Sequence, residues 1–168
     1  MFQVFNIKDK VVYGETGVCL IEDICEKEFI KNQKKKYYVL KPISSNGNLI
    51  YSPIENNKIL MRNIISEKEA EILMQSIPDI AENIQGFTEF TVDDYKNEIL
   101  SQNPKKLVKL ITQIYNKKKT VQIQKKRFNA IDEKYMKIAE NLLFGELSEA
   151  LEIDINEVRN YVLKIIQT

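Results

Sequence analysis

Two apolar runs separated by a tetrapeptide with a glycine at each end set the strongest constraint on how this chain folds. The tetrapeptide is Gly14-Glu15-Thr16-Gly17, and the flanking runs within residues 9–24 are rich in Val, Ile and Tyr. Glycine adopts backbone angles that other residues resist, and β-branched and aromatic side chains suit a pleated sheet. Residues 9–24 are therefore predicted to form a β-hairpin.

Side chains in the second run are expected to alternate between two faces of the strand, as β geometry requires. The two expected sets are Val18, Leu20, Glu22 and Ile24 on one face, and Cys19, Ile21, Asp23 and Cys25 on the other. The two cysteines would lie about 20 Å apart along the strand, too far to bridge each other. We predict that both are small, apolar core residues.

Further strand and turn patterns extend this β-rich region. A polar stretch, 26–36, precedes an apolar strand at 37–40, and Asn46-Gly47 predicts a second hairpin turn before a returning strand at 49–52. Pro53 cannot donate to a ladder, so it should end that strand or lie on a sheet edge. Four or five short strands predict a small, strongly bent barrel or sheet.

From Ser66 the apolar spacing becomes helical. Ser66 and Glu69 form a capping-box pattern, and Pro78 is expected to end the first helix, with a loop over 79–90. Further helix starts are predicted near Thr91, Asn103-Pro104, Asn129 and Asp154. The fold class is therefore predicted as α+β: a β module at 1–62, followed by four or five helices at 63–168.

The composition argues against several function classes. The chain of 168 residues has no histidine, so the commonest general base and metal ligand is missing. We therefore expect no enzyme, no cofactor, no metal and no small-molecule substrate. No apolar run approaches the roughly 18 residues needed to cross a bilayer, and no signal peptide is apparent. A cytoplasmic protein that does not engage a membrane is expected.

The net charge of +1 hides strong segregation. Residues 104–128 contain nine Lys or Arg and no Asp or Glu, whereas residues 66–103 contain two basic and nine acidic residues. A basic stripe of this kind favours DNA or another polyanion as a partner. The alternative is a solvated helix end whose cations are neutralised within the protein.

A second DNA-binding pattern is weaker. Residues 146–163 have the spacing of a helix-turn-helix, but Arg159, Asn160 and Lys164 are the only polar or basic contacts that its second helix offers. A recognition helix needs several donors to phosphates and base edges. We therefore favour the interpretation that residues 146–163 belong to two helices that pack together and close the domain.

Several motifs resemble a known family. Residues 9–13, Gly17-Val18, residues 37–40 and Pro53 resemble the N-terminal module of CarD-like (CdnL) bacterial transcription regulators, which is shared with the transcription-repair coupling factor. The helical part resembles the CarD C-terminal domain at four dipeptides: Tyr95-Lys96, Lys106-Leu107, Glu146-Leu147 and Ala150-Leu151.

The resemblance implies a fold and a mechanism. Residues 1–62 would form a Tudor-like β-barrel that binds the β subunit of bacterial RNA polymerase by pairing an edge strand. The residues that resemble its polymerase-facing surface are Lys27, Phe29, Ile50 and Tyr51. Residues 63–168 would rest on promoter DNA and stabilise the open complex, so the protein would be nucleoid-associated.

The resemblance also implies a DNA contact, with departures. Family members commonly carry a tryptophan wedge where Phe90 or Thr91 stands, and arginines where Asp93 and Asp94 stand. Phe90 is the residue here that could act as the apolar wedge. The expected DNA-binding residues are Phe90, Lys96, Lys117, Lys118, Lys119, Lys125, Lys126 and Arg127. The alternative function is a protein-interaction adaptor with a Tudor/SH3-like module and no direct DNA binding.

Overall fold

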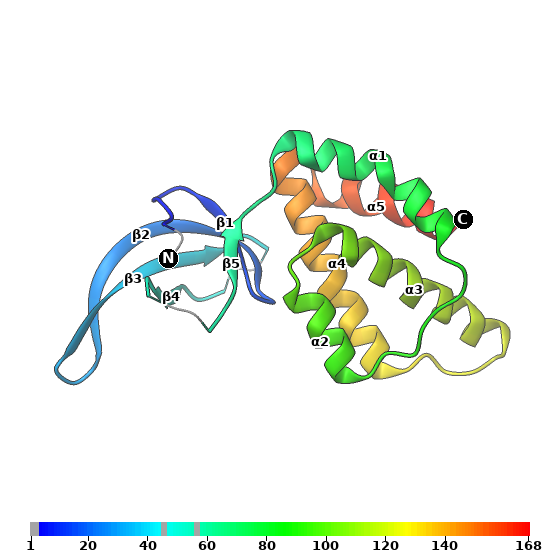
Figure 1. Ribbon diagram of the computed structural model, residues 1–168, viewed down its shortest axis with the longest axis horizontal. Helices are drawn as coiled ribbons and strands as arrows, with labels where there is room; N and C mark the ends of the chain where they lie inside the picture. The colour runs from blue at the N-terminus through cyan, green and yellow to red at the C-terminus, as the bar shows by residue number, and fades with distance from the viewer. Residues whose placement is uncertain (1–3, 45–46, 56–57) are drawn as a thin grey trace. The chain divides into compact units, whose positions relative to one another are not determined.

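A computed structural model describes residues 4–44, 47–55 and 58–168 (Figure 1). The chain divides between Ile64 and Ile65 into a β-rich N-terminal unit and a helical unit. The observed class is α+β, as predicted. The Asn46-Gly47 turn falls partly outside the described residues. None of the helices in the described ranges is long and apolar enough to span a membrane.

The N-terminal unit is a five-stranded antiparallel sheet of order β4-β3-β2-β1-β5. The strands are β1 (Lys10–Tyr13), β2 (Gly17–Ile30), β3 (Gln33–Pro42), β4 (Ile50–Pro53) and β5 (Met61–Asn63). No described strand joins β4 to β5, so the sheet is open and closure into a Tudor-like barrel is not confirmed. Pro53 ends an edge strand, as expected.

The predicted hairpin is confirmed. Tyr13 pairs with Gly17 across the turn, and both turn glycines have positive φ, 47° at Gly14 and 89° at Gly17. The backbone angle favours glycine at position 14, and a Cβ atom there would lie 2.9 Å from a methyl carbon of Ile59, which would have to shift.

A β-bulge between Ile21 and Asp23 breaks the expected alternation along β2. Ile21 and Ile24 pair with Leu40 and Tyr38 of the core face, whereas Cys25 is moved to the opposite face. The prediction that Cys19 and Cys25 share a face is therefore wrong. Cys19 is fully buried, and burial raises the pKa of its thiol to about 11.

The polar stretch at 26–36 does not separate two strands but belongs to them. β2 continues to Ile30 and turns through Asn32, whose φ is 64°, into β3 (Figure 1). Asparagine tolerates this left-handed conformation, and its backbone N–H donates to a Glu28 carboxylate oxygen at 2.6 Å. The result is a two-stranded ribbon that extends beyond the pairing with β1 and β4.

The helical unit contains five helices in the predicted order. They are α1 (Glu67–Asn83), α2 (Val92–Leu100), α3 (Pro104–Ile123), α4 (Ala130–Leu151) and α5 (Ile155–Ile166). The predicted helix starts are all confirmed, and the N-cap residues are Ser66, Thr91, Asn103, Asn129 and Asp154. α4 contacts each of the other four helices, so the core is built around it. The packing of α5 on α4 agrees with the favoured interpretation of the C-terminal segment.

Pro78 does not end α1, which continues to Asn83. Proline removes one helical hydrogen bond, but Ile77 and Ile80 on either side of it are buried in the core. The Ser76 hydroxyl donates to the Leu73 carbonyl oxygen at 2.7 Å, so a side chain also bonds to the helix backbone just before Pro78. Burial of the apolar stripe thus outweighs the local cost of proline.

Candidate functional site

An aromatic cluster lies on the outer face of the N-terminal sheet. The Phe29 ring meets the Tyr37 ring edge-on at 5.0 Å and the Tyr51 ring at 5.4 Å between centroids. Tyr37 is buried beneath the cluster, but Phe29 is 58% exposed and Tyr51 is 37% exposed. Edge-to-face packing holds these rings in place while leaving apolar surface open to a partner.

The strand register decides which predicted polymerase-facing residues share this surface. Tyr51 pairs with Val39, which lies two positions from Tyr37 on β3 and therefore on the same face. Lys27 lies two positions from Cys25, the partner of Tyr37, so Lys27 is also on the aromatic face. Ile50 points the other way and packs against the core of the unit. The structure therefore brings Phe29 and Tyr51 together, places Lys27 on the same face, and separates Ile50 from them.

An unpaired strand edge borders the aromatic cluster. β4 pairs with β3 on one side, and on its other side no described strand continues the sheet. Such an edge can accept a strand from another chain, with main-chain hydrogen bonds supplying the contact. Aromatic side chains beside the edge supply the apolar contact area that interfaces favour.

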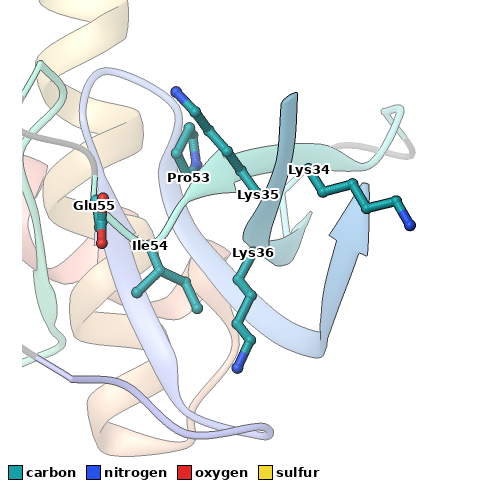
Figure 2. Close-up of a pocket in the computed structure, with 6 residues that line it drawn as sticks. All are labelled: Lys34, Lys35, Lys36, Pro53, Ile54 and Glu55. Carbon is teal, nitrogen blue, oxygen red and sulfur yellow. The ribbon is translucent and has the colours of Figure 1, made fainter. Parts of the chain in front are cut away.

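A shallow cavity of about 260 Å³ lies where β3 meets the end of β4 (Figure 2). Its lining residues are Lys34, Lys35, Lys36, Pro53, Ile54 and Glu55. Figure 2 shows the three lysine side chains pointing in different directions, so their ammonium groups do not converge on one anion. Within the described residues, no group of three His, Cys, Asp or Glu side chains could hold a metal ion.

An open sheet with aromatic residues beside a free edge is a surface to which a strand of another protein can add. Residues 5–65 match the family model of the CarD-like/TRCF RID domain. The N-terminal unit is thus a CarD-like module of the RNA polymerase-interacting type, which confirms the resemblance for this part of the chain. No curated protein matches the chain in a sequence search.

Phe90, the expected DNA wedge in the helical unit, is held in an aromatic stack. Its ring stacks on Tyr95 at 5.1 Å and 27°, and Tyr95 in turn stacks on Tyr135 at 4.7 Å and 10°. Phe90 is half-buried and packs against the core of the helical unit. Its observed role is to hold the segment before α2 on the helices.

Asp93 and Asp94, where the resemblance leads us to expect arginines, lie in the first turn of α2. The Asp94 carboxylate accepts a bond from the Thr91 backbone N–H at 2.8 Å, and the Thr91 hydroxyl oxygen accepts one from the Asp94 N–H at 3.1 Å. The backbone bond from Thr91, followed by the side-chain bond, lowers the pKa of Asp94. Asp93 is exposed in the same turn, where negative charge complements the helix dipole.

Lys117 is an internal ion-pair residue. Its Nζ lies 2.6 Å from Asp132 Oδ2 and 2.7 Å from Glu89 Oε2, and its side chain is 13% exposed. Burial acts to lower the pKa of Lys117, but its bonds to Asp132 and Glu89 outweigh burial and raise it. The Tyr95 hydroxyl donates to Asp132 Oδ1 at 2.6 Å, so all four side chains form one network.

The remaining predicted cations differ in their surroundings. Lys118 Nζ lies 5.9 Å from the centre of the Tyr115 ring and 5.6 Å from that of Phe128, and Lys119 Nζ donates to the Gln167 carbonyl oxygen at 2.9 Å. Besides Lys119, whose ammonium group has this partner, the exposed members of the set are Lys96, Lys125, Lys126 and Arg127. In the part of the chain that the structure describes, these four form no ion pair.

Proposed function

We propose that this protein binds the β subunit of a bacterial RNA polymerase through its N-terminal unit. The observation that carries the proposal is the match of residues 5–65 to the CarD-like/TRCF RID domain. A strand of the polymerase would add to the free edge of β4, and Phe29 and Tyr51 would make the central apolar contact. Lys27 would contribute a charge on the same face.

The exposed aromatic pair supports this assignment physically. Large aromatic side chains that become desolvated at an interface carry a disproportionate share of binding energy. Phe29 and Tyr51 come from different strands but already contact each other, so little conformational entropy is lost when a partner covers them. Main-chain pairing at β4 would supply the orientation.

The first prediction concerns retention of purified polymerase by the immobilised full chain. The double variant Phe29→Ala, Tyr51→Ala should weaken binding at least tenfold, because truncating aromatic anchors typically costs 2 kcal/mol or more. Ile72→Ala is the matched control, since Ile72 is 57% exposed on α1 of the helical unit. Equal retention of polymerase by all three proteins would contradict the assignment.

Promoter DNA is the second partner that we propose, with stabilisation of the open complex as the outcome. The contact would be made by Lys125, Lys126 and Arg127, which we call the basic corner, with Lys96 as a further phosphate contact. The basic corner is favoured because its three exposed cations are consecutive and lie in a segment of 25 residues, 104–128, without an acid. Lys117, Lys118 and Lys119 are left out because their side chains have partners within the helical unit.

The second prediction is a change in the salt dependence of DNA binding. Reversal of all three charges of the basic corner to Glu should reduce the slope of log K against log salt by about 3, since each phosphate contact contributes about 0.9. The control variant is Lys105→Glu, Lys106→Glu, Lys109→Glu near the start of α3, with the same change in net charge. Equal losses in both variants would assign the effect to overall charge and contradict the proposed contact.

The adaptor function predicts a different pair of results. If the full chain retains polymerase but binds no DNA at low salt, the protein is a docking module without a DNA step. Two observations favour a test of this outcome. Phe90 is held in an aromatic stack, and Lys117 is paired within the helical unit, so neither is free to contact DNA. Open-complex lifetime on a promoter, measured with and without the chain, then reports on any effect transmitted through polymerase alone.

A further inference from the structure

The end of α3 has an unusual choice of residues. The Lys125 N–H donates to the Gln122 carbonyl oxygen at 3.0 Å, and the Lys126 N–H donates to that of Val121 at 2.9 Å. This pair of bonds is the Schellman motif, which ends many helices. Its left-handed position is normally glycine, but here it is Lys125, with a φ of 56°.

The residue at the next position of the Schellman motif, Lys126, is also atypical. The residue after the left-handed one commonly makes an apolar contact with the last turn, but here it is Lys126. Cations just beyond a helix end do interact favourably with its dipole. A lysine within the last turn would gain the same interaction without backbone strain, yet that turn of α3 carries no basic residue. Placing lysines at these two positions is better explained by a ligand than by the fold.

Ile123, the last residue of α3, precedes these cations by two residues. It is 82% exposed, more than any other large hydrophobic side chain in the described ranges. The acids at the start of α4 are engaged elsewhere: Asp132 pairs with Lys117, and Glu133 lies 3.9 Å from Lys137. The corner thus presents one apolar side chain next to three cations without ion pairs.

We infer that Ile123 inserts at an unstacked or easily deformed base step of duplex DNA while the basic corner holds the flanking phosphates. Aliphatic side chains rimmed by cations are suited to this task, because unstacking a step exposes apolar base surface. A membrane surface is a poorer match, since peripheral binding needs a broad apolar face rather than one residue. The inference rests on the proposed DNA contact and adds the kind of DNA that the chain prefers.

The experiment measures binding of the full chain to two short duplexes that differ by one central mismatch. Unstacking a base step costs less free energy at a mismatch, so wild type should bind the mismatched duplex roughly tenfold more tightly than the paired duplex. Ile123→Ala should abolish this preference while leaving affinity for the paired duplex within about twofold. Ile72→Ala should keep both values, and reversal of the basic corner should weaken binding to both duplexes.

Several outcomes would overturn the inference. It fails if wild type binds both duplexes equally, or if Ile123→Ala keeps the preference; the proposed phosphate contact then still stands on its own. Absence of any DNA binding by wild type instead removes the proposed contact itself. Tighter binding to anionic phosphatidylglycerol vesicles than to either duplex, lost in Ile123→Ala, would make the corner a membrane contact.

Discussion

Asp132 is the residue on which the internal charges of the helical unit converge. It is 2% exposed, accepts a hydrogen bond from Tyr95 of α2 and forms an ion pair with Lys117 of α3, so one carboxylate joins three helices. A buried carboxylate is costly unless it is paired and hydrogen-bonded. Here Oδ1 accepts the Tyr95 hydrogen bond, and Oδ2 lies 2.6 Å from the Lys117 ammonium nitrogen. Lys117 is therefore needed to neutralise the core of the unit.

The third prediction concerns removal of this carboxylate. Asp132→Ala should lower the free energy of unfolding by about 3 kcal/mol, because Lys117 and the buried Tyr95 hydroxyl lose a partner. Urea unfolding followed by circular dichroism measures the change. Glu133→Ala, which removes the exposed neighbouring carboxylate, should change stability by no more than about 0.5 kcal/mol. Similar unfolding midpoints for the two variants would disprove the role of Asp132.

The sequence could not reveal this network. Lys117 lies in an acid-free run and was therefore expected to contact DNA, while its partner Glu89 lies 28 residues away. Long-range pairs of this kind leave no local pattern. The Thr91–Asp94 cap, by contrast, spans three residues, so local spacing located the start of α2.

At the scale of the element, the helix starts were predictable, but the end of α1 was not. Each N-cap is a short-range side-chain bond, visible as a residue type at a fixed spacing. The continuation of α1 through Pro78 depends on burial of Ile77 and Ile80, which local propensity does not contain. The bulge after Ile21 likewise depends on pairing with β3, so alternation alone misplaced Cys25.

The fourth prediction tests the strained end of α3. Lys125→Gly should raise the free energy of unfolding by about 0.5–1 kcal/mol, since glycine relieves the left-handed backbone at a smaller entropic cost. Lys126→Gly is the control, because Lys126 does not have a positive φ and should gain nothing. Thermal unfolding of the two variants gives the comparison. If Lys125→Gly is no more stable than Lys126→Gly, then the left-handed backbone of Lys125 does not destabilise the protein.

At the scale of the whole molecule, the α+β class and the two-part organisation follow from the change in apolar period near Ser66. The family match ends at residue 65, where the helical unit begins. The Ile65 backbone N–H donates to the buried Glu146 carboxylate of α4 at 3.0 Å, which fixes the first residue of this unit on its own core. Lys27, Phe29 and Tyr51 share the aromatic face of the first unit, whereas Ile50 packs against its core, which a sequence pattern cannot show.

The short edge strand has a consequence for how long a docked complex would last. β4 has four residues, and its final residue, Pro53, has no N–H to donate. An added strand can therefore form only a few main-chain bonds, so the lifetime of the complex would depend mostly on Phe29 and Tyr51. Differences in affinity among related interfaces arise mainly in dissociation rates. A protein held in this way would leave polymerase between rounds of initiation rather than travel with it as a permanent subunit.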